Sequence, residues 1–310
     1  MMKKVTIIIP AYNEAESFDE IKTNMQEVVR NNIDYEWEFL LINDGSTDET
    51  LQKMEKLCIA DKHYHYIDLS RNYGKEIAIM AGLDYAQGDA VIIMDADMQH
   101  PINIIPEMLK YWEEGYEDVY AKRITRGKES WFRKRFSLLY YHLLQKTTRV
   151  EILENVGDFR LLDRKCINAL KQLRETQRYT KGMYCWVGFK KHEVLFEQGD
   201  RMAGESSFNF IRLLSLAIEG ITYFTTAPLR LATILGLIIS AVAFAYMCYI
   251  LVTTLIWDDP VAGYPTLITV ILFLGGIQLL SLGIIGEYLG RIFYETKERP
   301  VYLIRESAGV

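Results

Sequence analysis

Apolar residues in the first hundred positions gather in short runs, and each run ends at polar residues. The run at residues 4–10 is rich in β-branched side chains, and further strands are predicted at 39–42, 65–69 and 90–95. The segments between these runs, such as 75–86, have the length expected of helices. Strands that alternate with helices in this way indicate βαβ units and a mostly parallel sheet. The N-terminal two-thirds of the chain is therefore predicted to be an α/β domain.

Two longer hydrophobic runs follow at residues 231–257 and 264–286, and neither contains a charged residue. Each exceeds the roughly 20 residues that cross the hydrocarbon core of a bilayer, so two transmembrane helices are expected. Arg230 precedes the first run, and the loop between the runs carries no Lys or Arg. Four basic residues follow the second run: Arg291, Lys297, Arg299 and Arg305. The positive-inside rule then predicts a protein of the cell membrane whose N-terminal domain and both termini face the cytoplasm.

Two further segments have the composition of helices that lie in a membrane surface. Residues 131–149 mix aromatic, leucine and basic side chains, and residues 206–227 are apolar on most of the helical circumference. An ordinary amphipathic helix packed on the sheet is the alternative for the first segment. The chain is thus predicted to contain a catalytic domain at 1–205, an interfacial helix at 206–227, a two-helix transmembrane region at 228–294 and a tail at 295–310.

Composition narrows the function classes. The chain has 310 residues and a formal net charge of −6, which argues against a nucleic-acid partner because nucleic-acid binders carry a basic footprint. Its four cysteines are scattered and form no Cys-x-x-Cys pair. That pattern favours reduced thiols and indicates neither a zinc site nor a disulfide framework.

Two residues are expected to cap helices. Ser46 and Glu49 have the spacing of a capping box, which predicts a helix from Ser46 to about residue 59. Asp163 precedes a second helical segment, predicted at about 163–174.

Four acids fall at the carboxyl ends of the predicted strands. Glu14 and Asp44 follow the first two strands, and Asp95 and Asp97 follow the strand at 90–95. Ligands of open α/β sheets bind at this edge. If the strand continued, alternation would point Asp95 and Asp97 to the same side. An Asp-x-Asp pair alone also fits two solvated loop acids, so the neighbouring acids decide its interpretation.

Four acids at one edge would repel one another unless a cation or a donor-rich ligand satisfied them. A nucleotide meets this need, with ribose and base donors for Asp44 and Glu14 and a metal-bridged diphosphate for Asp97. Mg²⁺ and Mn²⁺ prefer such oxygen ligands and commonly share them with substrate phosphates. The chain has neither Gly-x-Gly-x-x-Gly nor a P-loop pattern, so neither of those nucleotide sites is supported.

Five motifs carry a resemblance to a known family, and they occur in the order IIIPAYNE, INDGSTD, SRNYGKE, MDADMQHP and GDFRLLDR. With them the chain resembles the family 2 glycosyltransferases, which have a GT-A fold. The last three motifs and the two C-terminal runs narrow the resemblance to polyprenyl-phosphate glycosyltransferases. That group includes bactoprenol glucosyltransferases and, more distantly, dolichol-phosphate mannose synthase.

The resemblance implies a membrane-bound, metal-dependent, inverting hexosyltransferase. It would move a hexose, with glucose favoured, from a nucleoside diphosphate sugar to polyprenyl (undecaprenyl) phosphate. The lipid-linked sugar would then serve as donor for glycosylating an envelope polymer. UDP-glucose is the first expected donor, ahead of UDP-N-acetylglucosamine and GDP-mannose, and Mg²⁺ or Mn²⁺ is the expected cofactor. The resemblance also allows a homo-oligomer.

The resemblance further implies roles for individual residues. Asp95 and Asp97 would be the metal pair, with Asp97 the direct ligand, and Asp97 and Asp158 would be the catalytic residues. The acceptor is a phosphate monoester with a second pKa of about 6, so it needs little proton abstraction. A base role and an orienting role for Asp158 therefore both stay open. The residues expected to bind the nucleotide sugar are Pro10, Tyr12, Glu14, Asp44, Asp95, Ala96, Gln99, Arg123 and Arg201.

Two other functions compete with this interpretation. A processive polysaccharide synthase of the same superfamily needs a Gln-x-x-Arg-Trp motif and more spans, and Gln177-Arg178-Tyr179 does not satisfy that motif. A non-catalytic membrane scaffold that keeps the fold would be free to lose its acids. The presence of all four acids argues against a scaffold; these are Asp44, Asp95, Asp97 and Asp158.

Overall fold

The computed structural model describes residues 2–124, 156–176, 178–196, 227–257 and 263–310. The chain forms two compact units, one of Met1–Ser207 with Pro300–Val310 and the other of Phe208–Arg299. Arg201 and the interfacial segments predicted at 131–149 and 206–226 lie outside the described residues.

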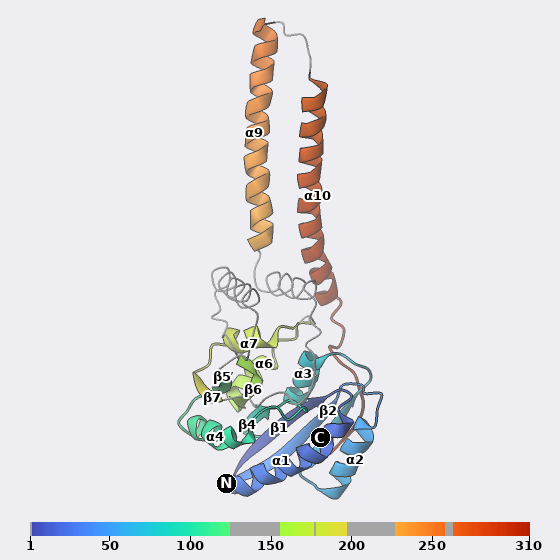
Figure 1. Ribbon diagram of the computed structural model, residues 1–310, viewed down its shortest axis with the longest axis vertical. Coiled ribbons are helices and arrows are strands. Elements are labelled where there is room, and N and C mark those ends of the chain that lie inside the picture. Colours follow the sequence, from blue (N-terminus) through green and yellow to red (C-terminus); the bar gives the residue numbers. More distant parts are fainter. Residues whose placement is uncertain (1, 125–155, 177, 197–226, 258–262) are drawn as a thin grey trace. The chain divides into compact units, whose positions relative to one another are not determined.

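Within residues 3–123 the strands and helices alternate along the chain (Figure 1). The strands are β1 (Lys3–Ala11), β2 (Tyr35–Asn43), β3 (Tyr64–Leu69), β4 (Ala90–Ile93), β5 (Asp118–Arg123), β6 (Val156–Asp163), β7 (Lys191–Phe196) and β8 (Ile304–Ala308). The helices are η1 (Ala15–Ser17), α1 (Phe18–Asn31), α2 (Thr50–Ala60), α3 (Lys75–Tyr85), η2 (Ile102–Ile104), α4 (Ile105–Glu113), α6 (Arg164–Leu170), α7 (Thr180–Trp186), α9 (Ala227–Trp257) and α10 (Tyr264–Glu295).

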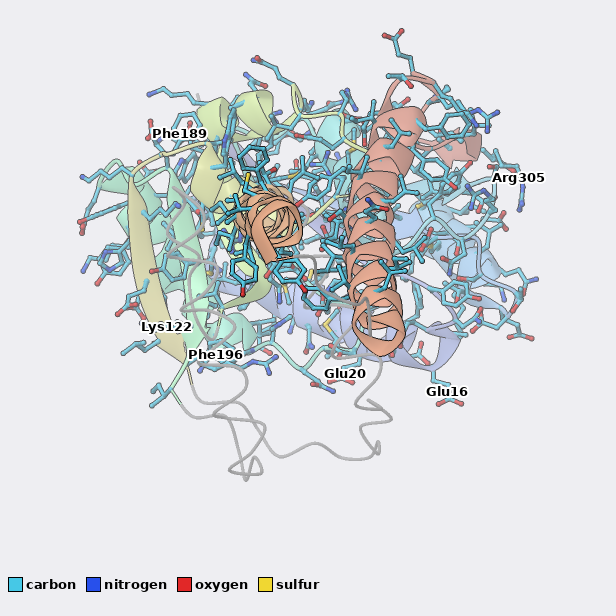
Figure 2. All side chains as sticks on the ribbon, turned by 90° about the horizontal axis from the view of Figure 1, so that it is seen from above. Glu16, Glu20, Lys122, Phe189, Phe196 and Arg305 are labelled. Atoms are coloured by element: carbon cyan, nitrogen blue, oxygen red, sulfur yellow. The ribbon has the colours of Figure 1, made fainter. Side chains whose placement is uncertain are left out.

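The described strands of the first unit form one eight-stranded sheet in the order β7-β5-β6-β4-β1-β2-β3-β8. Its centre is parallel, since β1 pairs with β2 and β4, and β2 pairs with β3. Antiparallel pairs join β6 to β4 and β5, and β8 to β3. The mostly parallel α/β sheet expected from the alternation of strands and helices is confirmed. Figure 2 shows Lys122 and Phe196 at the β5–β7 edge and Arg305 of β8 at the opposite edge.

The core lies on both faces of the sheet, because β1 is buried on both sides. Ile7 and Ile9 of β1 belong to one apolar cluster with Phe18 and other α1 residues. Ile8, which points to the other face, lies so close to Gly82 of α3 that a side chain there would overlap it. Figure 1 shows α1 and α2 along one face of the sheet and α3 across from them. Full burial of each such branched side chain contributes about 1.5–3 kcal/mol.

A buried ion pair crosses the antiparallel half of the sheet. Arg160 of β6 lies 3.1 Å from Asp118 of β5, and both side chains are almost inaccessible to water. The Arg160 guanidinium also stacks 3.7 Å from the ring centroid of Tyr184 in α7. The pair therefore fixes β6 at the point where the strand carries Asp158.

Two helices differ from the sequence-based expectation. The capping-box prediction was wrong, because α2 begins at Thr50 and its N-cap residue, Glu49, makes no side-chain cap; the Asp48 carboxylate accepts from the Thr50 amide at 3.0 Å. The Ser46 hydroxyl instead accepts a hydrogen bond from the Asn13 amide, so it holds the loop that follows β1. Asp163 does cap α6, accepting from the Lys165 amide at 2.9 Å, but that helix ends at Leu170, earlier than expected.

The second unit contains the long apolar helices α9 and α10. Within the described residues, one segment, Phe273–Glu295, is long and apolar enough to cross a membrane, and the apolar segment Ala232–Tyr246 is shorter. The arrangement with two spans therefore stays a prediction from sequence.

Replacing Asp118 with alanine should strongly destabilise the first unit. The change leaves the Arg160 charge buried without its partner, which costs about 3–5 kcal/mol. The control is Lys122→Ala, which removes a surface pair with Glu193 (2.7 Å) and should cost only about 0.2–1 kcal/mol. Chemical unfolding of the detergent-solubilised chain measures both, and equal losses for the two variants would contradict the assigned role of the buried pair.

Candidate active site

A cleft opens at the carboxyl ends of β1, β2 and β4, beside the first residue of α3. Its cavity volume is about 220 Å³, which is below the roughly 300–1,000 Å³ usual for small-molecule sites. Its lining residues are Pro10, Ala11, Tyr12, Glu14, Asp44, Lys75, Ala78, Asp95, Ala96 and Asp97. The structure thus brings together the four acids expected at this sheet edge, and adds a lysine to them.

Asp44 ties two loops of the cleft together. Its two carboxylate oxygens accept hydrogen bonds from the amides of Tyr73 (2.7 Å) and Gly74 (2.9 Å), and the side chain is buried. Burial raises the pKa of Asp44, although the two amide bonds oppose that rise. Gly45 lets the loops approach, since its φ is +67° and a Cβ would overlap the backbone of Arg71. Asp44 therefore fixes the backbone immediately before Lys75.

Lys75 bridges two carboxylates from different strands. Its Nζ lies 2.6 Å from Asp95 Oδ1, just beyond β4, and 2.9 Å from Asp158 Oδ2 in β6. Burial alone would raise the pKa of Asp158, but the charge of Lys75 holds it below its ordinary value. Burial likewise opposes the charge of Lys75, yet Asp158 and Asp95 together raise the lysine's pKa well above its ordinary range. Asp158 and Lys75 are therefore both charged at neutral pH.

Glu14 adds negative charge on the β1 side of the cleft. Burial raises the pKa of Glu14, a hydrogen bond from Ser17 opposes that rise, and the charges of Asp97 and Asp95 add to it. Tyr12 lies beside it with 45% of its surface exposed, so the ring is free to contact a ligand. The cleft thus presents an exposed aromatic face next to a concentration of carboxylates.

The Asp95–Asp97 segment is a turn rather than part of a strand. β4 ends at Ile93, and Met98 has a positive φ of 49°, so strand alternation does not explain how the two acids face the cleft. His100 supports the turn: it stacks on Phe159 with ring centroids 4.7 Å apart, and its Nδ1 lies 3.5 Å from the Asp95 amide. Burial lowers the pKa of His100, which keeps the ring uncharged.

The acids at this turn form an incomplete ligand set for a divalent cation. The described residues contain no group of three or more His, Cys, Asp or Glu side chains that could hold a metal ion. Asp95 is engaged by Lys75, whereas Asp97 is exposed and its Oδ1 accepts from the Gln99 amide at 3.2 Å. One or two carboxylates completed by phosphate oxygens and water is the usual Mg²⁺ arrangement, so these residues fit a cation that arrives with a diphosphate.

Some predicted site residues are not gathered here. Among the described residues, those that line the cleft do not include Gln99, Arg123 or Asp158. Asp158 is connected to it through Lys75, and Gln99 through Asp97. Arg123 lies at the end of β5, where its charge acts on His100. The roles expected for all of these residues stay predictions.

Lys75 is the residue that the sequence analysis did not single out. It lies within the motif SRNYGKE, directly after Gly74, whose φ is +93°. A glycine of this kind before an apolar helix marks a tight turn into the helix N-terminus, and the first helical side chain then faces the strand ends. The position of Lys75 at the start of the helix could therefore be predicted from the sequence. Its partners could not, because they are distant from it in the sequence.

The chain matches two families of known proteins. Residues 6–170 match glycosyl transferase family 2, and residues 227–292 match the GtrB C-terminal hairpin. A putative glycosyltransferase, CsbB, of Bacillus subtilis is 45% identical over 98% of this chain and 92% of its own length. A prophage-derived bactoprenol glucosyl transferase of Shigella flexneri is 40% identical over 98% of each chain.

One solved structure carries a fold comparison. Glucosyl-3-phosphoglycerate synthase from Mycobacterium tuberculosis, in complex with Mn²⁺, UDP and phosphoglyceric acid, superposes with a TM-score of 0.51. It is 16% identical, and the match covers 71% of this chain and 76% of that one. This likeness concerns the fold alone, and it supports the expected GT-A-type sheet.

Replacing Lys75 with methionine should reverse the pH dependence of the contribution that Asp158 makes to folding stability. In the wild type the lowered pKa of Asp158 contributes stability that is present above about pH 4 and lost as pH falls through the folded-state pKa. Without Lys75, burial raises that pKa above its ordinary value, so stability should decrease as pH rises from about 4.

Thermal midpoints measured across this pH range test the reversal. Lys53→Met is the control, because Lys53 lies 4.0 Å from the fully exposed Asp19. Its profile should run parallel to that of the wild type. A parallel profile for Lys75→Met as well would show that Lys75 does not set the charge of Asp158.

Proposed function

This chain belongs to glycosyl transferase family 2, and from that premise we propose that it transfers glucose from UDP-glucose to a polyprenyl phosphate such as undecaprenyl phosphate. The observation that carries the proposal is its 40% identity, over nearly the full length of both chains, to a bactoprenol glucosyl transferase. The names of the relatives, bactoprenol glucosyl transferases, support a polyprenyl acceptor. The product would be a lipid-linked sugar for decorating an envelope polymer.

The acid cleft is our proposed donor site. The exposed ring of Tyr12 offers a stacking surface for the base. Glu14 and Asp44 offer acceptors for the hydrogen-bond donors of the base and the ribose. Asp97, with Asp95 beside it, would hold Mg²⁺ or Mn²⁺ together with the donor diphosphate. That cation would neutralise charge on the departing nucleoside diphosphate. Pro10, Ala96 and Gln99 would complete the donor contacts, and Arg123 and Arg201 would face the phosphates.

The reaction would be a single displacement with inversion. A phosphate oxygen of the acceptor attacks the anomeric carbon, and the bond from that carbon to the diphosphate breaks on the opposite side. The nucleoside diphosphate leaves with the bonding electron pair, so atoms and charge balance without a further reactant. Alignment of the acceptor oxygen with the anomeric carbon would supply much of the rate.

Asp158 is better suited to orientation than to proton abstraction. Its pKa is held low by Lys75, which makes it a weak base. The acceptor phosphate, with a second pKa of about 6, is largely dianionic at neutral pH and needs no base. We therefore propose that Asp158 positions Lys75, whose ammonium group would hold the acceptor phosphate near the donor.

The proposed membrane arrangement is the one that the sequence predicts. We propose that residues 228–294 form two transmembrane helices, that 131–149 and 206–227 lie in the membrane surface, and that the 1–205 domain faces the cytoplasm. Phe273–Glu295 is the segment whose length and hydropathy support a span directly. The donor would then be drawn from the cytoplasm and the acceptor headgroup from the inner leaflet.

A transfer assay tests the proposed function. Purified protein, undecaprenyl phosphate and Mg²⁺ or Mn²⁺ are mixed separately with labelled UDP-glucose, UDP-N-acetylglucosamine or GDP-mannose. Label should enter lipid from UDP-glucose, and Asp97→Asn should lower the rate by about 100-fold or more, since the cation contributes several kcal/mol. The control is Asp34→Asn, an exposed acid outside the cleft that should leave the rate unchanged. Absence of transfer from all three donors would contradict the proposal and favour a scaffold.

The pH dependence of transfer separates the two roles of Asp158. If Asp158 orients, Asp158→Asn should lower kcat but keep a rise in rate through about pH 6, where the acceptor phosphate loses its second proton. If Asp158 were the base, this substitution would abolish the part of the rise in rate with pH that follows the ionisation of Asp158. Profiles of kcat/KM for both proteins distinguish these outcomes.

A further inference from the structure

The C-terminal tail is built into the sheet that carries the proposed donor site. Residues Pro300–Val310 belong to the same compact unit as the sheet domain. β8 pairs antiparallel with β3, with Asp68 opposite Glu306, and the Ser70 amide donates to the Leu303 carbonyl at 2.9 Å. The chain that leaves α10 therefore ends as β8, an edge strand of the first unit.

Arg305 of β8 supplies the positive charge for a buried acid. Its Nη1 lies 3.2 Å from Asp68 Oδ2, and its Nη2 donates to the Ser70 carbonyl at 2.7 Å. The Asp68 side chain is 1% exposed, whereas that of Arg305 is 58% exposed. A carboxylate buried to this degree needs a partner for its charge, and Arg305 reaches it from the sheet edge seen in Figure 2.

The second oxygen of Asp68 orients Asn43. Asn43 Nδ2 donates to Asp68 Oδ1 at 2.6 Å, and Asn43 Oδ1 accepts from the Ser46 amide at 3.1 Å. An ionised carboxylate only accepts, so it forces the NH₂ end of the Asn43 amide toward itself and leaves the carbonyl end for Ser46. If the amide turned over, two acceptors would face each other at Asp68 and two donors at Ser46.

The loop that Asn43 holds is part of the cleft. Asn43 is buried and directly precedes Asp44, and the Ser46 hydroxyl accepts from the Asn13 amide at 3.0 Å between Tyr12 and Glu14. The contacts from Arg305 through Asp68 and Asn43 to Ser46 are therefore continuous. They end at the loops proposed to contact the base and ribose.

We propose that Arg305 is a positioning residue for donor binding. By holding the charge of Asp68, it sets the orientation of Asn43 and thereby the loop of residues 43–46 on the nucleotide side of the cleft. This inference rests on the proposed function, since it assumes that the cleft takes a nucleoside diphosphate sugar. It makes the segment that follows α10 a component of the donor site.

Replacing Arg305 should not detach the tail. Tyr302 donates to Asp84 Oδ2 at 2.7 Å, Tyr66 donates to Glu306 Oε1 at 3.0 Å, and the backbone pairing of β8 does not use the Arg305 side chain. A variant at Arg305 therefore tests the contact with Asp68 rather than the fold of the edge.

The experiment measures UDP binding and transfer kinetics on the full chain in detergent. Arg305→Gln should raise the Kd for UDP and the KM for UDP-glucose about tenfold, which corresponds to about 1.4 kcal/mol, while kcat stays within about twofold. Arg305→Lys keeps the charge and should lie closer to the wild type. Arg299→Gln, a neutralised exposed arginine of the same tail, should leave both constants unchanged.

A second substitution distinguishes a positioning role of Arg305 from general damage to the structure. Adding Asp68→Asn to Arg305→Gln removes the unpaired charge and keeps a carbonyl acceptor for Asn43, so the Kd for UDP should return toward the wild-type value. Hydrogen exchange at the Ser46 amide should be faster in Arg305→Gln and slower again in the double variant. A merely structural role would not produce this selective recovery.

Three results would overturn the inference. These are an unchanged Kd in Arg305→Gln, an equal loss in Arg299→Gln, or a fall in kcat with KM unaltered. Failure of the proposed function looks different, because then the wild type itself would bind no UDP and transfer no sugar. If the wild type binds UDP and Arg305→Gln leaves that binding unchanged, only the role of Arg305 is contradicted and the proposed function is not.

Discussion

The ion pairs of Lys75 with Asp95 and Asp158 are the interaction on which the candidate site depends. Lys75 brings together an acid just beyond β4 and an acid within β6, at distances of 2.6 and 2.9 Å. Those strands are antiparallel neighbours, with Ile93 opposite Arg160, so the sheet already brings the two acids close. Without a positive charge between them, two partly buried carboxylates would repel each other and the site would open or bind protons.

The surrounding structure serves to hold that lysine in place. Asp44 fixes the Tyr73 and Gly74 amides immediately before α3 begins, and Gly45 permits the close approach that this requires. The buried pair of Arg160 and Asp118 fixes β6 two residues beyond Asp158. In the proposed reaction, the same positive charge would help to hold the acceptor phosphate, and Asp97 would remain free to share a cation with the donor. Binding and catalysis would then use one set of contacts.

Sequence reasoning located the acids but not the contacts that organise them. Asp44 and Asp97 follow apolar runs, and the carboxyl ends of parallel strands meet at one edge, so their meeting was predictable. Lys75 was not, because its partners belong to β4 and β6 and only the folded sheet brings them together. The Ser46–Glu49 spacing was misleading, since the Ser46 hydroxyl accepts from the Asn13 amide instead. The pairing of β8 with β3 joins segments far apart in the chain, which no local pattern in residues 304–308 reveals.

The most direct test of the account is Mn²⁺ binding followed by electron paramagnetic resonance, with and without UDP-glucose. The central claim is that Asp97 and the donor diphosphate hold the cation jointly, because the described residues provide no complete metal site by themselves. The account predicts weak Mn²⁺ binding to the protein alone, tight binding once UDP-glucose is added, and loss of the tight binding in Asp97→Asn. Mn²⁺ binding that is equally tight without UDP-glucose, or unchanged in Asp97→Asn, would contradict it.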